Sequence, residues 1–256
     1  MASHSLSDSL RVLCREAVRS PWILSALRWL PDRDDAGDRA GSRDSVLVLG
    51  GLFSHPFYYA PLGRALEHRG YPVHFDDGTF NTRPFRPHVA DLCRRVEAIA
   101  DATGAPVRIV GHSLGGLHAM ALLADRPAVV GQVIAVASPV VGGTPWEPLE
   151  RVAERILRIE ASDSAELQAR VAPLAERITT VSAPQDLVAP PTSCAIEGAS
   201  NVVLSTIPRR DQSLASHDGV IFMRTVVQVV LAALEQPLVA FEHASRALVR
   251  RAAVGV

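Results

Sequence analysis

The chain has 256 residues, of which 48% are hydrophobic and 21% are charged, and its formal net charge at pH 7 is −1. This length and apolar content suit one large domain with a well-buried core, and we do not expect a second full domain. A net charge so close to zero gives no general attraction to nucleic acid or to an anionic membrane surface. Cys14, Cys93 and Cys194 stand far apart, so their spacing predicts neither a disulfide framework nor a metal site.

The first 44 residues differ in character from the rest. Residues 6–30 place apolar side chains at helical spacing with charged residues between them, which predicts an amphipathic helix broken near Pro21. We expect this helix to pack on the main domain; a membrane-surface contact or a wall over a substrate site are the alternatives. Residues 31–45 are rich in charge, Pro and Gly and predict a solvated linker. The expected division is a helix and linker at 1–44 and one domain at 45–256.

No membrane-spanning segment is expected. The chain has no run of about 18 consecutive apolar residues, and its N-terminus has no cationic segment followed by a continuous apolar stretch. The sequence therefore predicts a cytoplasmic protein, unless a leader has been removed from it.

From residue 46 the chain alternates short apolar runs with longer amphipathic stretches, which predict buried strands and surface helices respectively. Strands are expected at 46–49, 73–75, 107–110, 132–137, 178–181 and 202–207, and helices at 59–69, 89–102, 114–125 and 219–234. Residues 145–176 predict a short insertion of charged amphipathic helices without a strand. The alternation predicts an α/β fold: a compact, mostly parallel sheet of about six strands with helices on both faces.

The third predicted strand ends in the sequence Gly-His-Ser-Leu-Gly at 111–115 and passes at once into a helix. A serine hydroxyl is a weak nucleophile at neutral pH, so it must be held where a base and backbone amides can reach it. A sharp strand-to-helix turn does this, and Gly111 and Gly115 fit the two positions where a side chain would collide with the turn. The segment is typical of a nucleophile elbow with Ser113 as the nucleophile.

A matching acid and base follow later strands. In a parallel sheet the carboxyl ends of the strands lie at one edge, so the loops after them can meet. Asp186 follows the strand at 178–181, and His217 lies between the last strand and the last helix. In this reading His217 takes the proton of Ser113, and Asp186 orients and stabilises the imidazolium.

Other readings remain open for these polar residues. Asp211 and Asp163 are rivals for the acid, and His217 could instead cap the last helix. His112 and His118 are expected to be packing residues, and a substrate-facing role is the alternative reading for His55, which lies in the loop after the first strand.

The oxyanion formed during acyl transfer needs two hydrogen-bond donors. The backbone amide of Leu114 is one candidate, and the amide of Leu52, or alternatively of Phe53, is the other. Apolar side chains near the same loops are candidates for substrate contact: Phe53, Phe57, Val140 and Trp146. The apolar residues of the insertion could roof an apolar pocket or pack as an ordinary helix does.

Taken together, residues 45–235 resemble the α/β-hydrolase superfamily, and within it the small bacterial lipases and esterases. Besides the elbow, three segments carry the resemblance: Gly50-Gly51-Leu52-Phe53, Ser138-Pro139 with Gly143-Thr144, and Asp186-Leu187-Val188. One departure is that Gly50 stands where the family commonly has a histidine, which leaves open what anchors this loop.

The resemblance implies a serine carboxylester hydrolase that forms an acyl-enzyme from a small-molecule or lipid acyl ester, without a cofactor or a metal. A thioesterase or acyltransferase with the same triad is the alternative, and a non-catalytic binding protein is less favoured. The acyl-chain length, the leaving group and the oligomeric state do not follow from the sequence.

Overall fold

The computed structural model describes residues 44–76, 80–141, 143–144, 147–159 and 161–238. The helix predicted at 6–30 and nearly all of the linker lie outside these residues. Within them, six parallel strands form one sheet in the order β2-β1-β3-β4-β5-β6. The strands are β1 (Val46–Leu49), β2 (Val73–Phe75), β3 (Val107–His112), β4 (Val130–Val136), β5 (Ile178–Ser182) and β6 (Ser200–Val203). The predicted parallel sheet of about six strands is confirmed.

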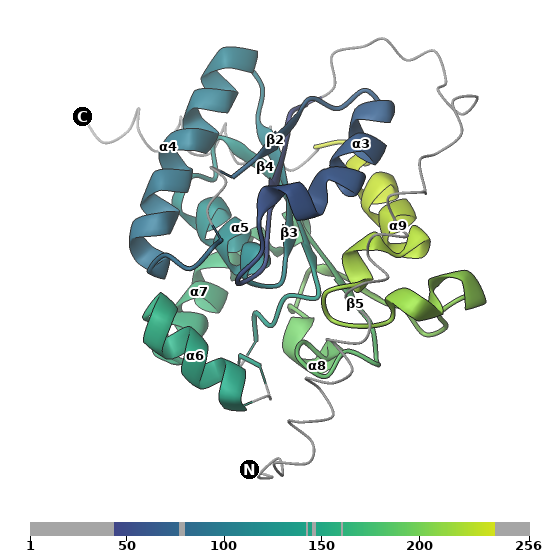
Figure 1. Ribbon diagram of the computed structural model, residues 1–256. Coiled ribbons are helices and arrows are strands. Elements are labelled where there is room, and N and C mark those ends of the chain that lie inside the picture. Colours follow the sequence, from purple (N-terminus) through teal and green to yellow (C-terminus); the bar gives the residue numbers. More distant parts are fainter. Residues whose placement is uncertain (1–43, 77–79, 142, 145–146, 160, 239–256) are drawn as a thin grey trace.

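Helices cover both faces of this sheet (Figure 1). The longer ones are α3 (Ala60–His68), α4 (Phe85–Thr103), α5 (Leu114–Asp125), α6 (Glu147–Leu157), α7 (Ala161–Val171) and α9 (Arg224–Leu234). The short ones are η3 (Pro56–Tyr59), η4 (Ala172–Arg177), α8 (Pro191–Cys194), η5 (Arg209–Leu214) and η6 (Val220–Phe222). The described residues of the insertion expected at 145–176 supply α6, α7 and most of η4, which agrees with the predicted helices.

Alternation along the strands produces two hydrophobic cores. Val46 and Val48 of β1 belong to the core under α3 and α9, whereas Leu47 and Leu49 belong to the core under α4 and α5. Successive side chains of a strand point to opposite faces, so a strand that is apolar throughout must be covered on both. This is why β1 could be recognised as a continuous apolar run.

Two predicted elements near the end of the chain have different bounds. The last strand begins at Ser200 and ends at Val203, earlier than predicted, because this edge strand is largely exposed and has no continuous apolar run. The last helix is not continuous from 219. The backbone of Met223 is extended, with φ −58° and ψ 131°, and separates η6 from α9.

Among the described residues, no helix is both long enough and apolar enough to cross a bilayer. Because all six strands are parallel, their carboxyl ends lie along one edge of the sheet, and the loops there carry the residues singled out from the sequence. Helices α6 and α7 lie toward the same end as α8, below α4 and α5 in the view of Figure 1.

Candidate active site

Ser113 stands at the turn between β3 and α5 in a conformation that few L-residues adopt, with φ 53° and ψ −120°. Close approach of the backbone explains its glycine neighbours. A Cβ on Gly115 would lie 2.2 Å from the carbonyl oxygen of Leu49, and one on Gly111 would lie 2.4 Å from the carbonyl oxygen of Gly115. The amide of Ser113 donates to the carbonyl of Val136 at 3.0 Å. Strain of this kind persists only where the surroundings fix it, and here it presents the hydroxyl at the sheet edge.

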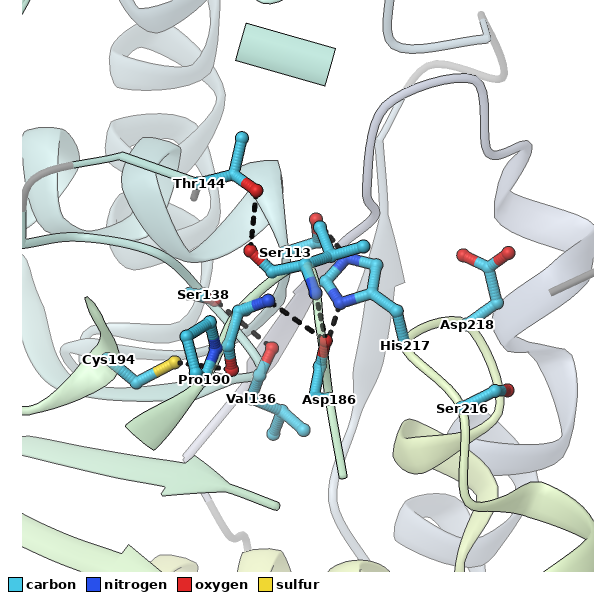
Figure 2. A network of polar contacts seen from close by, with 12 residues as sticks. Ser113, Val136, Ser138, Thr144, Asp186, Pro190, Cys194, Ser216, His217 and Asp218 are labelled. Carbon is cyan, nitrogen blue, oxygen red and sulfur yellow. Dashed lines mark hydrogen bonds and ion pairs between the residues drawn. The ribbon is translucent and has the colours of Figure 1, made fainter. Parts of the chain in front are cut away.

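Three buried side chains from three loops meet at this turn, and Figure 2 shows His217 between the other two. The Nε2 of His217 lies 2.8 Å from Oγ of Ser113, and its Nδ1 lies 2.9 Å from Oδ2 of Asp186. Ser113, Asp186 and His217 are 9%, 3% and 6% exposed. The fold therefore brings together the three residues that the sequence singled out as nucleophile, acid and base, each from the loop that was expected.

The environment of Asp186 favours its ionised form. Burial by itself would raise the pKa of this carboxyl group, but His217 and the amides of Val188 and Ala189 outweigh it, so the pKa is lowered. Both amides donate to Oδ1 at 2.9 Å, which leaves Oδ2 for the imidazole. A carboxylate fixed in this way can hold one tautomer of the histidine and stabilise its protonated form.

The two rival acids have other partners. Asp211 accepts hydrogen bonds from the amides of Arg224 and Thr225 and so holds the start of α9. Asp163 forms an ion pair with Arg86. Among the histidines, the side chain of His55 accepts from the amide of Phe57 and caps η3. His118 is buried at 1% exposure, which fits the expected packing role.

The two predicted oxyanion donors lie beside Ser113. A Cβ on Gly51 would be 3.2 Å from the Cβ of Ser113, so the loop after β1 passes directly over the nucleophile. Leu52 and Leu114 both border the same cavity as Ser113. Within the described part of the chain, neither of their amides donates to a protein acceptor. Two unpaired N–H groups next to a nucleophile are what an oxyanion requires.

Tyr59 anchors the loop after β1, in which Gly50 stands where the resemblance led us to expect a histidine. The amide of Gly51 donates to the Tyr59 hydroxyl at 2.8 Å. A Cβ on Gly50 would lie 2.6 Å from the Tyr59 ring, so a side chain at this position would collide with it. Burial raises the pKa of Tyr59, so the phenol keeps its proton. This anchor was not foreseen from the sequence.

His112 connects that anchor to the base. Its Nε2 lies 3.0 Å from the carbonyl oxygen of His217, and its Nδ1 lies 2.9 Å from the Tyr59 hydroxyl. Burial lowers the pKa of His112 to about 3, so the ring is neutral at physiological pH. Because a carbonyl only accepts, Nε2 carries the proton and Nδ1 accepts from Tyr59. The residue predicted to be mere packing therefore links the oxyanion loop to the backbone of His217.

A cavity of about 140 Å³ opens beside Ser113, and its walls are mostly apolar. Its described walls come from the oxyanion loop, the elbow with α5, the loop after β4, the insertion with α6 and α7, and the loop after β5: Leu52, Ser113, Leu114, Leu117, Pro139, Gly143, Thr144, Glu150, Ala153, Glu154, Leu157, Ile159, Ser164 and Val188. Leu157 and Ile159 belong to the predicted insertion, so this segment forms a wall of the cavity as well as packing on the domain.

The described residues that were predicted to contact substrate do not border this cavity. Phe53 and Phe57 are 54% and 73% exposed and do not border this cavity. Val140 is only 2% exposed and packs in the core with α7, where Gln168 donates to its carbonyl, so it does not border the cavity either. Trp146 lies outside the described residues. Leu117, Pro139 and Val188 were missed, because their sequence neighbourhoods do not show which loops face one another.

In the described residues, no group of three or more His, Cys, Asp and Glu side chains is arranged to hold a metal ion. Two carboxylates, Glu150 and Glu154, border the cavity beside Ser113.

Comparison with known proteins agrees with this architecture. Residues 46–256 match the model of the alpha/beta hydrolase family. A protein of Variovorax paradoxus described as a carbamate hydrolase, RutD, is 33% identical over 99 residues, a match that spans 36% of this chain and 37% of that relative. The mature lipase of Bacillus licheniformis has a similar fold, with a TM-score of 0.58 and 13% identity over 75% of this chain and 92% of the lipase.

A thioesterase domain from the curacin biosynthetic pathway also has a similar fold, with a TM-score of 0.53 and 13% identity over 76% of this chain and 92% of that domain. Identities this low show the fold alone. The family match, by contrast, covers most of the chain, and the protein belongs to the alpha/beta hydrolase family.

Proposed function

We propose that this protein is a serine hydrolase that cleaves carboxylic esters through an acyl-enzyme, with Ser113 as nucleophile, His217 as base and Asp186 as its orienting acid. One observation carries the proposal: the His217 ring lies within hydrogen-bond distance of the Ser113 hydroxyl on one side and the Asp186 carboxylate on the other. A hydroxyl in contact with an oriented imidazole is the arrangement that activates serine.

The chemistry follows from these positions. Oγ of Ser113 attacks the ester carbonyl carbon while its proton moves to Nε2 of His217. The tetrahedral oxyanion accepts hydrogen bonds from the amides of Leu52 and Leu114, and removal of one such donor typically costs about 3 kcal/mol of barrier. His217 then gives the proton to the departing alcohol. Water, deprotonated by His217 in turn, attacks the acyl-enzyme and releases the acid and Ser113.

The apolar walls of the cavity favour a substrate whose acyl chain is apolar. The walls next to Ser113 are formed by side chains such as Leu117, Leu157 and Val188, which would remove the chain from water.

The test is hydrolysis of p-nitrophenyl esters from acetyl to palmitoyl by the wild type, Ser113→Ala and His217→Ala. We expect turnover with an optimum chain length in the wild type, and a loss of kcat of at least about 10⁴-fold in both variants. Undiminished turnover by Ser113→Ala would contradict the proposal.

The leaving group needs a separate comparison. The substrates to compare are the oxygen ester and the thioester of the optimum acyl chain and the corresponding carbamate. We expect kcat/KM to be highest for the oxygen ester. A strong preference for the thioester would favour a thioesterase or acyltransferase with the same triad. The carbamate is included because the Variovorax paradoxus relative is described as a carbamate hydrolase.

A further inference from the structure

Of the two carboxylates that border the cavity beside Ser113, Glu150 is partly buried whereas Glu154 is exposed. Glu150, on α6, borders the cavity together with Leu157, Ile159 and other apolar residues. Its carboxylate is directed toward the loop after β4: a Cβ on Gly143 would lie 3.0 Å from Oε1 of Glu150. Gly143 borders the same cavity, so the charged end of Glu150 lies at the cavity wall and not only on the outer face of the helix.

Among the described residues, no cationic side chain forms an ion pair with this carboxylate. Glu150 also forms no hydrogen bond in the part of the chain that the structure describes. The nearest charged groups that affect it are also acidic: partial burial raises the pKa of Glu150, and Glu154 and Glu147 raise it further. Glu147 differs in being exposed and paired with Arg151 at 3.5 Å, and it does not border the cavity. A partly desolvated and unpaired carboxylate is stabilised by any cation placed beside it.

The cavity belongs to the acyl side of the substrate. The leaving-group oxygen must lie near Nε2 of His217 in order to take its proton. The described walls of the cavity include Ser113 and both candidate oxyanion residues, Leu52 and Leu114, but not His217. A chain that enters this cavity is therefore joined to the carbonyl carbon on the side away from the leaving group.

We propose that the acyl group held in this cavity carries a positive charge at its far end, and that Glu150 selects it. This inference rests on the proposed ester hydrolysis and names its substrate class: acyl esters with an apolar body and a distal ammonium group. An acyl group that ends in a carboxylate would meet Glu150 as a like charge in a partly buried setting and would be rejected.

The experiment compares three acyl chains of equal length and different terminal charge. The probes are the p-nitrophenyl esters of 6-aminohexanoate and hexanoate, and the mono-p-nitrophenyl ester of adipate. In the wild type we expect kcat/KM to be about 10-fold higher for the ammonium ester than for hexanoate, and lowest for the adipate ester. In Glu150→Gln we expect the ammonium preference to fall about 10-fold and the adipate ester to improve.

Two controls separate this inference from the function on which it rests. Glu147→Gln removes a charge from the same helix without touching the cavity, so it should keep the wild-type preference. Ser113→Ala should abolish turnover of all three esters. A wild type that prefers hexanoate, or a Glu150→Gln variant with unchanged ratios, would overturn the inference while leaving ester hydrolysis intact. If Ser113→Ala hydrolysed the three esters as fast as the wild type does, the proposed function itself would be overturned.

Discussion

Among the described residues, two histidine–aspartate pairs have a buried imidazole, and one of these pairs lies beside Ser113. His217 lies 2.9 Å from Asp186, and His88 of α4 lies 2.9 Å from Asp76, which follows β2. The far nitrogen of His217 faces the Ser113 hydroxyl. The far nitrogen of His88, by contrast, is buried and has no hydrogen-bond partner in the part of the chain that the structure describes. Similar pairs thus have different neighbours, so a histidine–aspartate contact by itself does not define an active site.

The surroundings of the two pairs differ in the same way. His217 is tied through its carbonyl to His112 and from there to Tyr59 and the oxyanion loop. The ring of His88 instead packs edge-on against His118, which in turn stacks on Phe85 at 4.8 Å. Both ring nitrogens of His118 are buried and have no hydrogen-bond partner among the described residues. One pair belongs to a connected polar network at the sheet edge, whereas the other belongs to an aromatic cluster between helices.

The largest expected difference between the pairs is in turnover. Asp186→Asn should lower kcat for the best p-nitrophenyl ester by about 10⁴-fold, because the amide can no longer hold the required tautomer of His217. Asp76→Asn makes the same chemical change in the other pair and should keep kcat within about 3-fold, while lowering the melting temperature. Comparable losses of kcat in both variants would remove the distinction drawn between the pairs.

A substitution in the hydrogen-bond network around His217 should lower kcat by less than Asp186→Asn does. Tyr59→Phe keeps the ring but removes the acceptor for the Gly51 amide and the donor to His112. We expect kcat to fall about 10-fold with little change in KM, because the oxyanion donor moves while the acyl cavity stays in place.

Tyr71→Phe provides the matched control for that loss. Tyr71 is equally buried and donates to the carbonyl of Leu234, and it belongs to neither the site nor its cavity. Its loss should cost stability of about 1 kcal/mol without a change in kcat. If both variants lose stability equally and neither loses activity, Tyr59 does not position the oxyanion loop.

The aromatic cluster around the second pair should respond to acid. Burial, and then the nearby His88, lower the pKa of His118 to about 3. In the unfolded chain an imidazole titrates near pH 6.5, so the unfolded state binds the extra proton first. The free energy of unfolding therefore falls as the pH drops from about 6.5 toward 3.

His118→Phe should reduce this dependence. Phenylalanine retains the stacking on Phe85 but cannot bind a proton, so the slope of stability against pH should decrease by up to about 1.4 kcal/mol per pH unit in that window. Urea unfolding at a series of pH values measures it. A slope equal to that of the wild type would show that His118 does not titrate on unfolding.

Local sequence patterns were sufficient to predict most of the strands, the nucleophile elbow and the three triad residues. A continuous apolar run marked β1, because a strand buried on both faces needs apolar side chains at successive positions. The strands β3, β4 and β5 include Arg108, Gln132 and Thr179, and the alternation of short apolar segments with helical ones marked them instead. The elbow was readable because Gly111 and Gly115 meet backbone that no side chain could avoid. Ser113, Asp186 and His217 could be placed at one edge because each follows a strand of a parallel sheet.

What could not be predicted depends on contacts between distant segments. The link from His112 to Tyr59 spans 53 residues, and that from His112 to the His217 carbonyl spans 105. No local pattern shows such partners, so His112 was read as packing. Val140 was read as a substrate contact from its position in a loop near the site, but the helix that buries it comes later in the chain.

The most direct test of the central claim is reaction with a fluorophosphonate, followed by intact-mass and peptide mass spectrometry. If Ser113 is an activated nucleophile, the wild type will take up one equivalent, the label will lie on Ser113, and His217→Ala will react at least about 100-fold more slowly. A folded wild type that stays unlabelled, or one that is labelled equally fast after Ser113→Ala, would contradict it.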